Sequence, residues 1–124
     1  MEKSEDDGTY KLTGHTGSIR YMAPEVAKCM PYTFSADAYS FGMIFWHIME
    51  MEAPFVTYNV RIHEDRVLRK GYRPVCNKQW PKTWSNLMQQ SWAHDPQKRP
   101  SFDKICETLS QEIDKADAKF VTMQ

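Results

Sequence analysis

The sequence predicts a mainly α-helical fold with one hydrophobic core. Large apolar residues recur at the three- and four-residue spacing of a helix in four segments, which begin near Ser35, Asn59, Trp84 and Ser101. We find no convincing strand pattern and no internal repeat. With 124 residues, of which 41% are hydrophobic, the chain has the size and apolar content of a single domain.

The central helix is predicted to begin after Ser35, a good N-cap residue, and to end at the Ala-Pro-Phe sequence of residues 53–55. Its apolar side chains point to every side, so we expect other elements to surround this helix. These side chains belong to Tyr39, Phe41, Met43, Ile44, Phe45, Trp46, Ile48 and Met49.

Three further helices are predicted downstream. The second runs from near Asn59 to Gly71 and has a charged outer face, the third ends at the His-Asp-Pro sequence of residues 94–96, and Ser101 caps the last. The predicted inward residues are Val60, Val67 and Leu68 in the second helix, Trp84, Leu87, Met88 and Trp92 in the third, and Phe102, Ile105, Cys106, Leu109 and Ile113 in the last.

The first 22 residues combine acidic residues, glycines and hydroxyl-bearing residues without a sustained period, which predicts a loop. A short helical turn is expected from Pro24. The expected organisation is therefore a loop over residues 1–22, a helical region over 23–115 and a tail over 116–124.

Composition excludes several classes of function. Lys+Arg 16 balance Asp+Glu 16, which disfavours nucleic acid and anionic membranes as partners. The three cysteines have an odd count and irregular spacing, which predicts reduced, mostly buried thiols in a cytoplasmic or nuclear protein. Neither cysteines nor histidines show ligand spacing, so no metal site is predicted.

The acidic N-terminus does not resemble a signal peptide, and the longest apolar run, residues 36–51, is shorter than the ~20 residues that span a bilayer.

Three separated motifs occur in an order known from one family. They are Met-Ala-Pro-Glu at 22–25, Asp-Ala-Tyr-Ser-Phe-Gly at 37–42 and Asp-Pro-Gln-Lys-Arg-Pro at 95–100. In these the chain resembles the C-terminal part of the large lobe of a eukaryotic protein kinase domain, from the activation segment with its APE motif to the last helix, over roughly residues 9–115. The implied fold is the helical C-terminal subdomain of the kinase fold, truncated, without the N-lobe and the catalytic loop.

The resemblance also indicates a group within this family. Trp92, the Asp-Pro pair at 95–96 and Phe102 are similar to tyrosine kinases and to tyrosine-kinase-like serine/threonine kinases. Gly17 and Ser18 favour the serine/threonine group, because tyrosine kinases use a roomier segment at this place. The resemblance implies that Gly17, Ser18 and Tyr21 position the protein substrate.

Structural roles follow from the same resemblance. Glu25 and Arg99 are expected to form a buried ion pair that ties the end of the activation segment to the loop before the last helix. Asp37 resembles the aspartate that holds the catalytic loop in other kinases. Without that loop, its remaining role is that of an acidic residue in the first turn of a helix.

Thr13 and Thr16 are candidate phosphorylation sites, and Tyr10 is a weaker one. They occupy the part of the activation segment that is often phosphorylated in the family that this chain resembles. A phosphate there can order the loop by pairing with arginine. The other interpretation is that they are ordinary polar loop residues.

The motifs that hold ATP and Mg²⁺ are absent from the 124 residues: the Gly-rich loop, the strand lysine with its helix glutamate, the catalytic HRD loop and the DFG aspartate. The resemblance therefore implies a fragment of an ATP-dependent protein serine/threonine kinase, a transferase, that is inactive alone and holds no cofactor. ATP and Mg²⁺ serve the full-length kinase. A gene-model or duplication artefact, or an internal methionine at position 1, would explain the truncation.

Two expectations concern stability. The helix and loop that cover the central helix in relatives are missing, so an exposed apolar patch and marginal stability are expected. Met51 stands where relatives often place a glycine, and a left-handed cap there would cost a non-glycine residue about 1 kcal/mol.

A second functional hypothesis is a non-catalytic helical interaction module that binds regulators or a parent kinase. It would use the mixed charged face of residues 60–70. In both hypotheses the partners are protein substrates or regulators.

Overall fold

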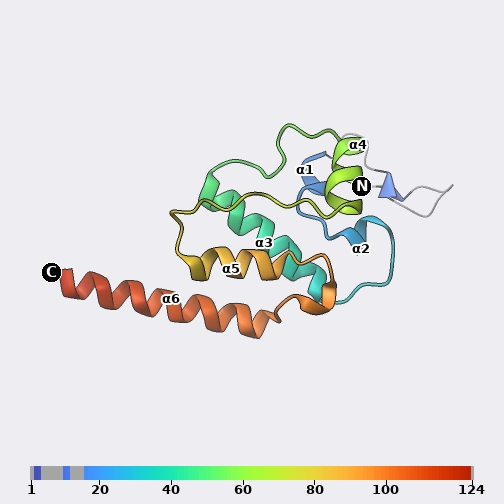
Figure 1. Cartoon of the computed structure of the whole chain (residues 1–124). Coiled ribbons are helices and arrows are strands. Elements are labelled where there is room, and N and C mark those ends of the chain that lie inside the picture. The colour runs from blue at the N-terminus through green and yellow to red at the C-terminus, as the bar shows by residue number, and fades with distance from the viewer. Residues whose placement is uncertain (1, 4–9, 12–15, 124) are drawn as a thin grey trace.

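The structure is a computed structural model in which we describe residues 2–3, 10–11 and 16–123, with side chains from Ser18 to Lys119. The predicted mainly α-helical fold is confirmed (Figure 1). In chain order the elements are β1 (Glu2–Lys3), β2 (Tyr10–Lys11), α1 (Thr16–Ile19), α2 (Pro24–Ala27), α3 (Ser35–Glu50), α4 (Val60–His63), the π-helix η1 (Glu64–Arg69), α5 (Lys82–Ser91), the 3₁₀-helix η2 (Pro96–Lys98) and α6 (Phe102–Met123).

The segment of residues 1–22 differs from the predicted loop where it is described. β1 and β2 pair in antiparallel fashion, with Glu2 opposite Lys11 and Lys3 opposite Tyr10. The single turn of α1 follows at Thr16. Pairs of two residues and single turns are too short to produce a hydrophobic period, so the sequence carried no signal for them.

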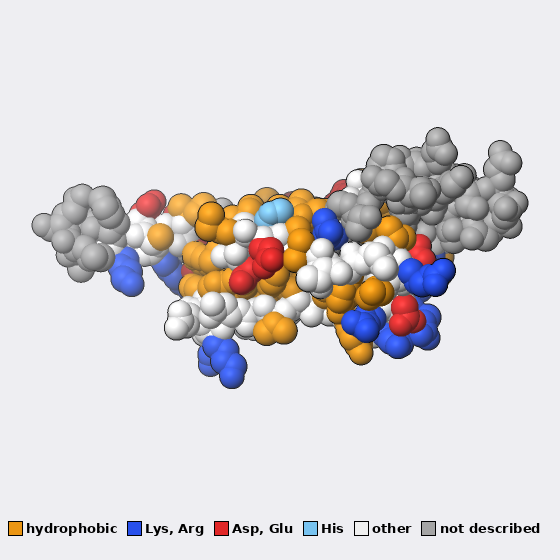
Figure 2. Space-filling model, turned by 90° about the horizontal axis from the view of Figure 1, so that it is seen from above, with side chains coloured by type: hydrophobic (Ala, Val, Ile, Leu, Met, Phe, Trp, Pro, Cys, Tyr) orange, Lys and Arg blue, Asp and Glu red, His pale blue; other side chains and the backbone are white. Residues whose placement is uncertain are grey.

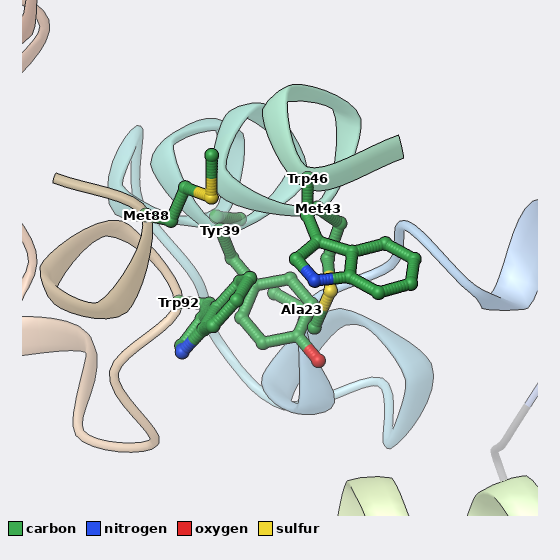
Figure 3. Close-up of a cluster of buried hydrophobic side chains, with 7 residues drawn as sticks. Ala23, Tyr39, Met43, Trp46, Met88 and Trp92 are labelled. Carbon is green, nitrogen blue, oxygen red and sulfur yellow. The ribbon is translucent and has the colours of Figure 1, made fainter. Parts of the chain in front are cut away.

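The central helix α3 lies beside α5, and the first turns of α6 pack against both through Phe102 and Ile105 (Figure 1). Gly42 permits the close approach of α3 and α5, because a Cβ atom there would lie 3.1 Å from the Met88 carbonyl oxygen. Tyr39, Met43 and Trp46 of α3 pack against Met88 and Trp92 in the resulting core (Figure 3). α2 and the loop after α5 pack against this core, which positions both of them.

The ends of α3 differ from the prediction in two ways. The N-cap is Phe34, and Ser35 is the first helical residue, so the expected cap at Ser35 is wrong. Thr33 takes part instead, because its hydroxyl accepts a hydrogen bond from the Ser35 N–H at 3.4 Å. At the other end, Met51 adopts the left-handed conformation with φ 58° and ψ 33°, and its N–H donates to the His47 carbonyl at 2.7 Å.

We expect Met51→Gly to stabilise the fold. Glycine adopts the left-handed cap without the steric cost of a Cβ atom, and the Met51 side chain is 89% exposed, so its removal sacrifices little packing. The expected gain is about 1 kcal/mol in the free energy of unfolding, measured by urea denaturation. A variant that unfolds at lower urea than the wild type would show that the methionine side chain matters more than the backbone.

The helix after Asn59 begins as predicted. The Asn59 side-chain oxygen accepts a hydrogen bond from the Ile62 N–H at 2.8 Å, Val67 and Leu68 are buried, and Gly71 ends the segment with φ 81°. The unexpected feature is that the α-helical turn of α4 continues as the π-helix η1.

The last helix departs from its predicted stripe and from its predicted end. Ser101 caps it as expected, accepting a hydrogen bond from the Lys104 N–H at 3.1 Å, and Ile105 is buried. Cys106 is exposed although it follows the buried Ile105, so it lies on the outer face of α6. Ile113 is 60% exposed, because the C-terminal part of α6 extends beyond the body of the molecule (Figure 1). Residues 116–123 continue the helix rather than forming a separate tail.

The expectation of mostly buried thiols is wrong as well. Cys29 and Cys76 are half-buried, and Cys106 is exposed. The sequence could not reveal this, because helical spacing identifies a face of a helix and not whether another element covers that face.

Candidate functional site

The best-defined polar site joins α2 to the loop before α6. Arg99 donates two hydrogen bonds to the two carboxylate oxygens of Glu25, at 2.6 and 3.0 Å. The exposed fraction of the side chain is 0% for Arg99 and 9% for Glu25. Such a two-pronged, charge-assisted pair fixes the relative orientation of both partners, which are 74 positions apart in the sequence.

The remaining donors of Arg99 connect two more segments. Its Nε donates to the Ala93 carbonyl at 2.8 Å, and one terminal nitrogen donates to the Ser35 carbonyl at 3.1 Å. The guanidinium therefore links α2, the start of α3 and the end of α5. Since its donors reach partners on three segments, the buried charge is well compensated.

Tyr39 lies between two guanidinium groups that the sequence did not suggest as a unit. Its ring centroid lies 5.2 Å from the Arg99 guanidinium carbon and 5.0 Å from that of Arg73. Burial raises the pKa of Tyr39 to about 12, although the two arginine charges act in the opposite direction. The buried hydroxyl has no hydrogen-bond partner among the described residues, so the ring, not the hydroxyl, makes the favourable contacts.

Arg73 is a residue of this site that the sequence did not suggest, and it links three backbone segments. Its Nε donates to the Trp92 carbonyl at 2.8 Å, and one terminal nitrogen donates to the Val67 and Tyr72 carbonyls at 3.2 and 2.8 Å. Burial lowers its pKa. In the sequence, Arg73 lies in a connector between Gly71 and Pro74. An arginine in a connector is usually solvated, so this position did not indicate that Arg73 is buried.

The predicted substrate-side residues lie on and just after α1. Thr16, Gly17 and Ser18 are the first three residues of α1, and the Ser18 side chain is exposed. Thr13 lies outside the described residues. Tyr21 holds this segment in place through its contacts with α3.

Tyr21 anchors the segment to α3 through its side chain and its backbone. Its hydroxyl lies 2.6 Å from His47 Nδ1, and the two rings stack with centroids 6.0 Å apart. Its carbonyl accepts a hydrogen bond from the Ser40 hydroxyl at 2.6 Å. Burial raises the pKa of Tyr21, and the charge of Arg20 opposes this shift.

Asp37 lines the same hollow as Arg99 but makes no ion pair with it. It is exposed in the first turn of α3, and its carboxylate has no hydrogen-bond or ion-pair partner among the described residues. It lines a hollow of about 480 Å³ together with Phe34 and Phe102. Its carboxylate is therefore available to a group outside this part of the chain.

His63 of α4 is buried, and its titration predicts that the stability of the fold depends on pH. Burial lowers its pKa from 6.5 to about 4, the charges of Arg20 and Arg73 act in the same direction, and a hydrogen bond with the Ile19 backbone opposes them. Because the folded pKa is the lower one, the unfolded chain binds this proton first, and stability falls between pH 6.5 and about 4. The contribution is at most about 1.4 kcal/mol per pH unit.

Urea unfolding of the wild type and of His63→Gln at several pH values between 7 and 4 tests this dependence. We expect the free energy of unfolding to fall less steeply with acid in the variant, because glutamine does not titrate. Equal slopes for both proteins would show that His63 does not contribute.

In the described ranges, no group of three or more His, Cys, Asp or Glu side chains is arranged to hold a metal ion. None of the helices described here is both long and apolar enough to cross a bilayer.

Comparison with known proteins identifies the family. The model of the family described as protein tyrosine and serine/threonine kinase matches residues 1–109. A probable serine/threonine-protein kinase of Dictyostelium discoideum is 34% identical over 116 residues, which cover 92% of this chain and 7% of that protein. The serine/threonine-protein kinase STY46 of Arabidopsis thaliana is 36% identical over 104 residues, covering 84% and 18%. The dual specificity protein kinase shkE of Dictyostelium discoideum is 35% identical over 99 residues, covering 79% and 14%.

The chain thus spans less than a fifth of the length of each of these relatives. The matches cover the three motifs at 22–25, 37–42 and 95–100, and they confirm the resemblance that those motifs indicated. This chain belongs to the protein tyrosine and serine/threonine kinase family.

Proposed function

We propose that this chain is the C-terminal part of the large lobe of a protein kinase whose whole chain transfers the γ-phosphoryl group of ATP to serine or threonine of protein substrates. The observation that carries the proposal is the buried pair of Glu25 and Arg99, which joins two of the family's motifs across 74 positions. The serine/threonine kinases among the relatives support the choice of acceptor.

In this proposal the segment from α1 to α2 is the end of the activation segment, and the site described above holds it in place. Gly17, Ser18 and Tyr21 would face the substrate, and the contacts of Tyr21 with α3 would keep them in position. Thr13 and Thr16 would be the sites of activating phosphorylation. Protein substrates and regulators are then the partners.

Asp37 would hold a catalytic loop that the 124 residues do not contain. Its exposure and its lack of a described partner support this role, because a carboxylate in such a position can accept backbone N–H groups from another segment. The unpaired cysteines support a reducing location, the cytoplasm or the nucleus.

Residues 1–124 alone are expected neither to bind Mg²⁺-ATP nor to transfer phosphate. No nucleotide-contacting motif of the family is present in the sequence, so ATP should produce no saturable shift of the melting temperature. A radiolabelled ATP assay with a generic protein substrate completes the test. Phosphate transfer that copurifies with the chain, together with a thermal shift, would contradict this part of the proposal.

Phosphoamino acid analysis tests the acceptor. A longer protein that restores the N-terminal half should label serine and threonine, and the same protein with its catalytic aspartate replaced by asparagine is the control. Labelling of tyrosine alone would overturn the assignment to serine/threonine kinases.

The alternative is a non-catalytic interaction module. The observation that favours it is the exposed basic side chains of Arg61, Arg66, Arg69 and Lys70 on α4, η1 and the residue that follows. Asp65 pairs with Arg69 and Lys70, and the Arg66 guanidinium lies 5.4 Å from the centroid of the Tyr58 ring. A restored protein that lacks phosphotransfer but binds a protein partner through this face would favour the module.

A further inference from the structure

Arg20 carries a positive charge two residues after Ser18, and no carboxylate neutralises it in the part of the chain that the structure describes. None of the ion pairs formed there includes Arg20. One terminal nitrogen donates to the Val56 carbonyl at 3.4 Å, which is a long hydrogen bond, and the buried Nε has no partner. The guanidinium is only half-buried, so its remaining donors are available to an anionic group.

Two other arginines of this region serve the fold itself. Arg99 pairs with Glu25 and donates to two carbonyls, and Arg73 donates to three carbonyls. Both guanidinium groups also contact the ring of Tyr39. The contacts of Arg20 are weaker by comparison, so stabilisation of the fold explains Arg73 and Arg99 but not Arg20.

The surroundings of Arg20 favour an anion. Besides burial, the charges of Arg20 and Arg73 lower the pKa of His63, so both guanidinium groups act on the same buried ring. α1 contains no charged residue, and the carboxylate of α2, Glu25, is already paired with Arg99. A negative group that approaches Arg20 therefore meets no free carboxylate of α1 or α2.

Positive charge continues from Arg20 to the outer face of α4 and η1. α1 packs against α4, and α2 packs against η1. The loop before α4 connects the two ends, because the Val56 carbonyl contacts Arg20 and the Tyr58 ring centroid lies 5.4 Å from the Arg66 guanidinium. Figure 2 shows Lys and Arg side chains gathered at the end of the molecule where α4 lies in Figure 1. We use the name basic strip for the side chains of Arg20, Arg61, Arg66, Arg69 and Lys70.

Two carboxylates within the basic strip limit what can bind there. Asp65 pairs with both Arg69 and Lys70, so one acid is shared by two bases, and Glu64 is exposed on the same segment. A polymer of uniform negative charge, such as nucleic acid, would meet these two carboxylates. A protein segment can place its acidic residues opposite the arginines alone. The zero net charge of the chain also disfavours nucleic acid.

We propose that the basic strip binds an acidic segment of a protein, with one carboxylate at Arg20 and another at Arg66. Arginine holds a carboxylate through two parallel hydrogen bonds, which gives such contacts a defined geometry. Val56 is 47% exposed beside Arg20 and offers apolar contact to one aliphatic residue of the segment. The assignment of this segment to the protein substrate rests on the proposed function, in which Gly17, Ser18 and Tyr21 face the substrate.

The test uses the full 124-residue chain and a synthetic peptide of about 12 residues, which spans up to about 40 Å when extended. The peptide carries several glutamates around one leucine, and its twin has glutamine in place of each glutamate. Fluorescence anisotropy measures the two dissociation constants. We expect the acidic peptide to bind at least about 10-fold more tightly than the twin. This preference should shrink at 1 M NaCl, where charges are screened within about 3 Å.

Substitutions on the chain locate the binding surface. Arg20→Gln and Arg66→Gln should each weaken binding of the acidic peptide about 5- to 10-fold, since each removes one charge-assisted contact. Lys82→Gln is the matched control, because it removes an exposed positive charge at the start of α5, at the end of the molecule remote from α4 (Figure 1). It should leave binding unchanged. Circular dichroism shows whether each variant retains its helices, and the exposed Arg66 keeps the test decisive if Arg20→Gln unfolds the chain.

Equal binding of the acidic peptide and its twin would overturn the inference, as would a loss with Lys82→Gln as large as that with Arg20→Gln and Arg66→Gln. A single-stranded oligonucleotide of the same charge that binds more tightly than the peptide would overturn the choice of a protein partner. The proposed function fails separately, because peptide binding requires no phosphate transfer and the phosphoamino acid analysis requires no acidic segment.

Discussion

Alanine at Glu25 or at Arg99 is expected to cost about 3–5 kcal/mol in the free energy of unfolding. The exposed side-chain fractions are 9% for Glu25 and 0% for Arg99, so each single substitution leaves a buried charge without its partner. The double substitution removes both charges and should cost much less than the sum of the two. The coupling energy from this cycle, obtained by urea denaturation, measures the interaction between Glu25 and Arg99.

A matched control is available on the surface. Lys104 and Glu107 form an ion pair at 3.7 Å with exposed side-chain fractions of 61% and 56%, and its coupling energy should be close to zero. If the isolated chain is too unstable for the measurement, a longer protein with the N-terminal half restored takes its place. Additivity of the Glu25 and Arg99 substitutions within about 0.5 kcal/mol would mean that they do not form the buried pair.

The second large effect is expected at Tyr39. Its ring is fully buried between the guanidinium groups of Arg73 and Arg99, and it packs against the core of α3 and α5 (Figure 3). Tyr39→Ala should cost about 3–5 kcal/mol, because it opens a cavity and removes both cation–π contacts.

Tyr39→Phe is the companion variant. The hydroxyl is buried without a partner, so phenylalanine retains the ring contacts and removes an unsatisfied polar group. We expect the free energy of unfolding to stay the same or to rise. A loss of more than about 1 kcal/mol would mean that the Tyr39 hydroxyl makes a stabilising hydrogen bond.

Local features of the fold were predictable because they depend on neighbouring residues. The caps at Asn59 and Ser101 are formed by side chains that reach backbone groups three residues away. The π-helix η1 was not predictable, because an amphipathic sequence such as that of residues 60–69 suits an α-helix equally well. The exposure of Ile113 followed from the reach of α6 beyond the body, which periodicity does not reveal.

The candidate site was only partly accessible from sequence. No local pattern relates Glu25 to Arg99, and only the resemblance to kinases suggested that they meet. Arg73 and Tyr39 escaped notice because a ring between two guanidinium groups is assembled from three segments, and none of these segments carries a distinctive pattern alone.

Sequencing of the full-length transcript shows directly whether this chain is part of a phosphate-transferring kinase. We expect an open reading frame that continues upstream of the codon for Met1 and encodes the HxD and DFG motifs of a protein kinase. An in-frame stop codon immediately upstream in the mature transcript, with neither motif encoded, would contradict the claim that this chain is part of a phosphate-transferring kinase.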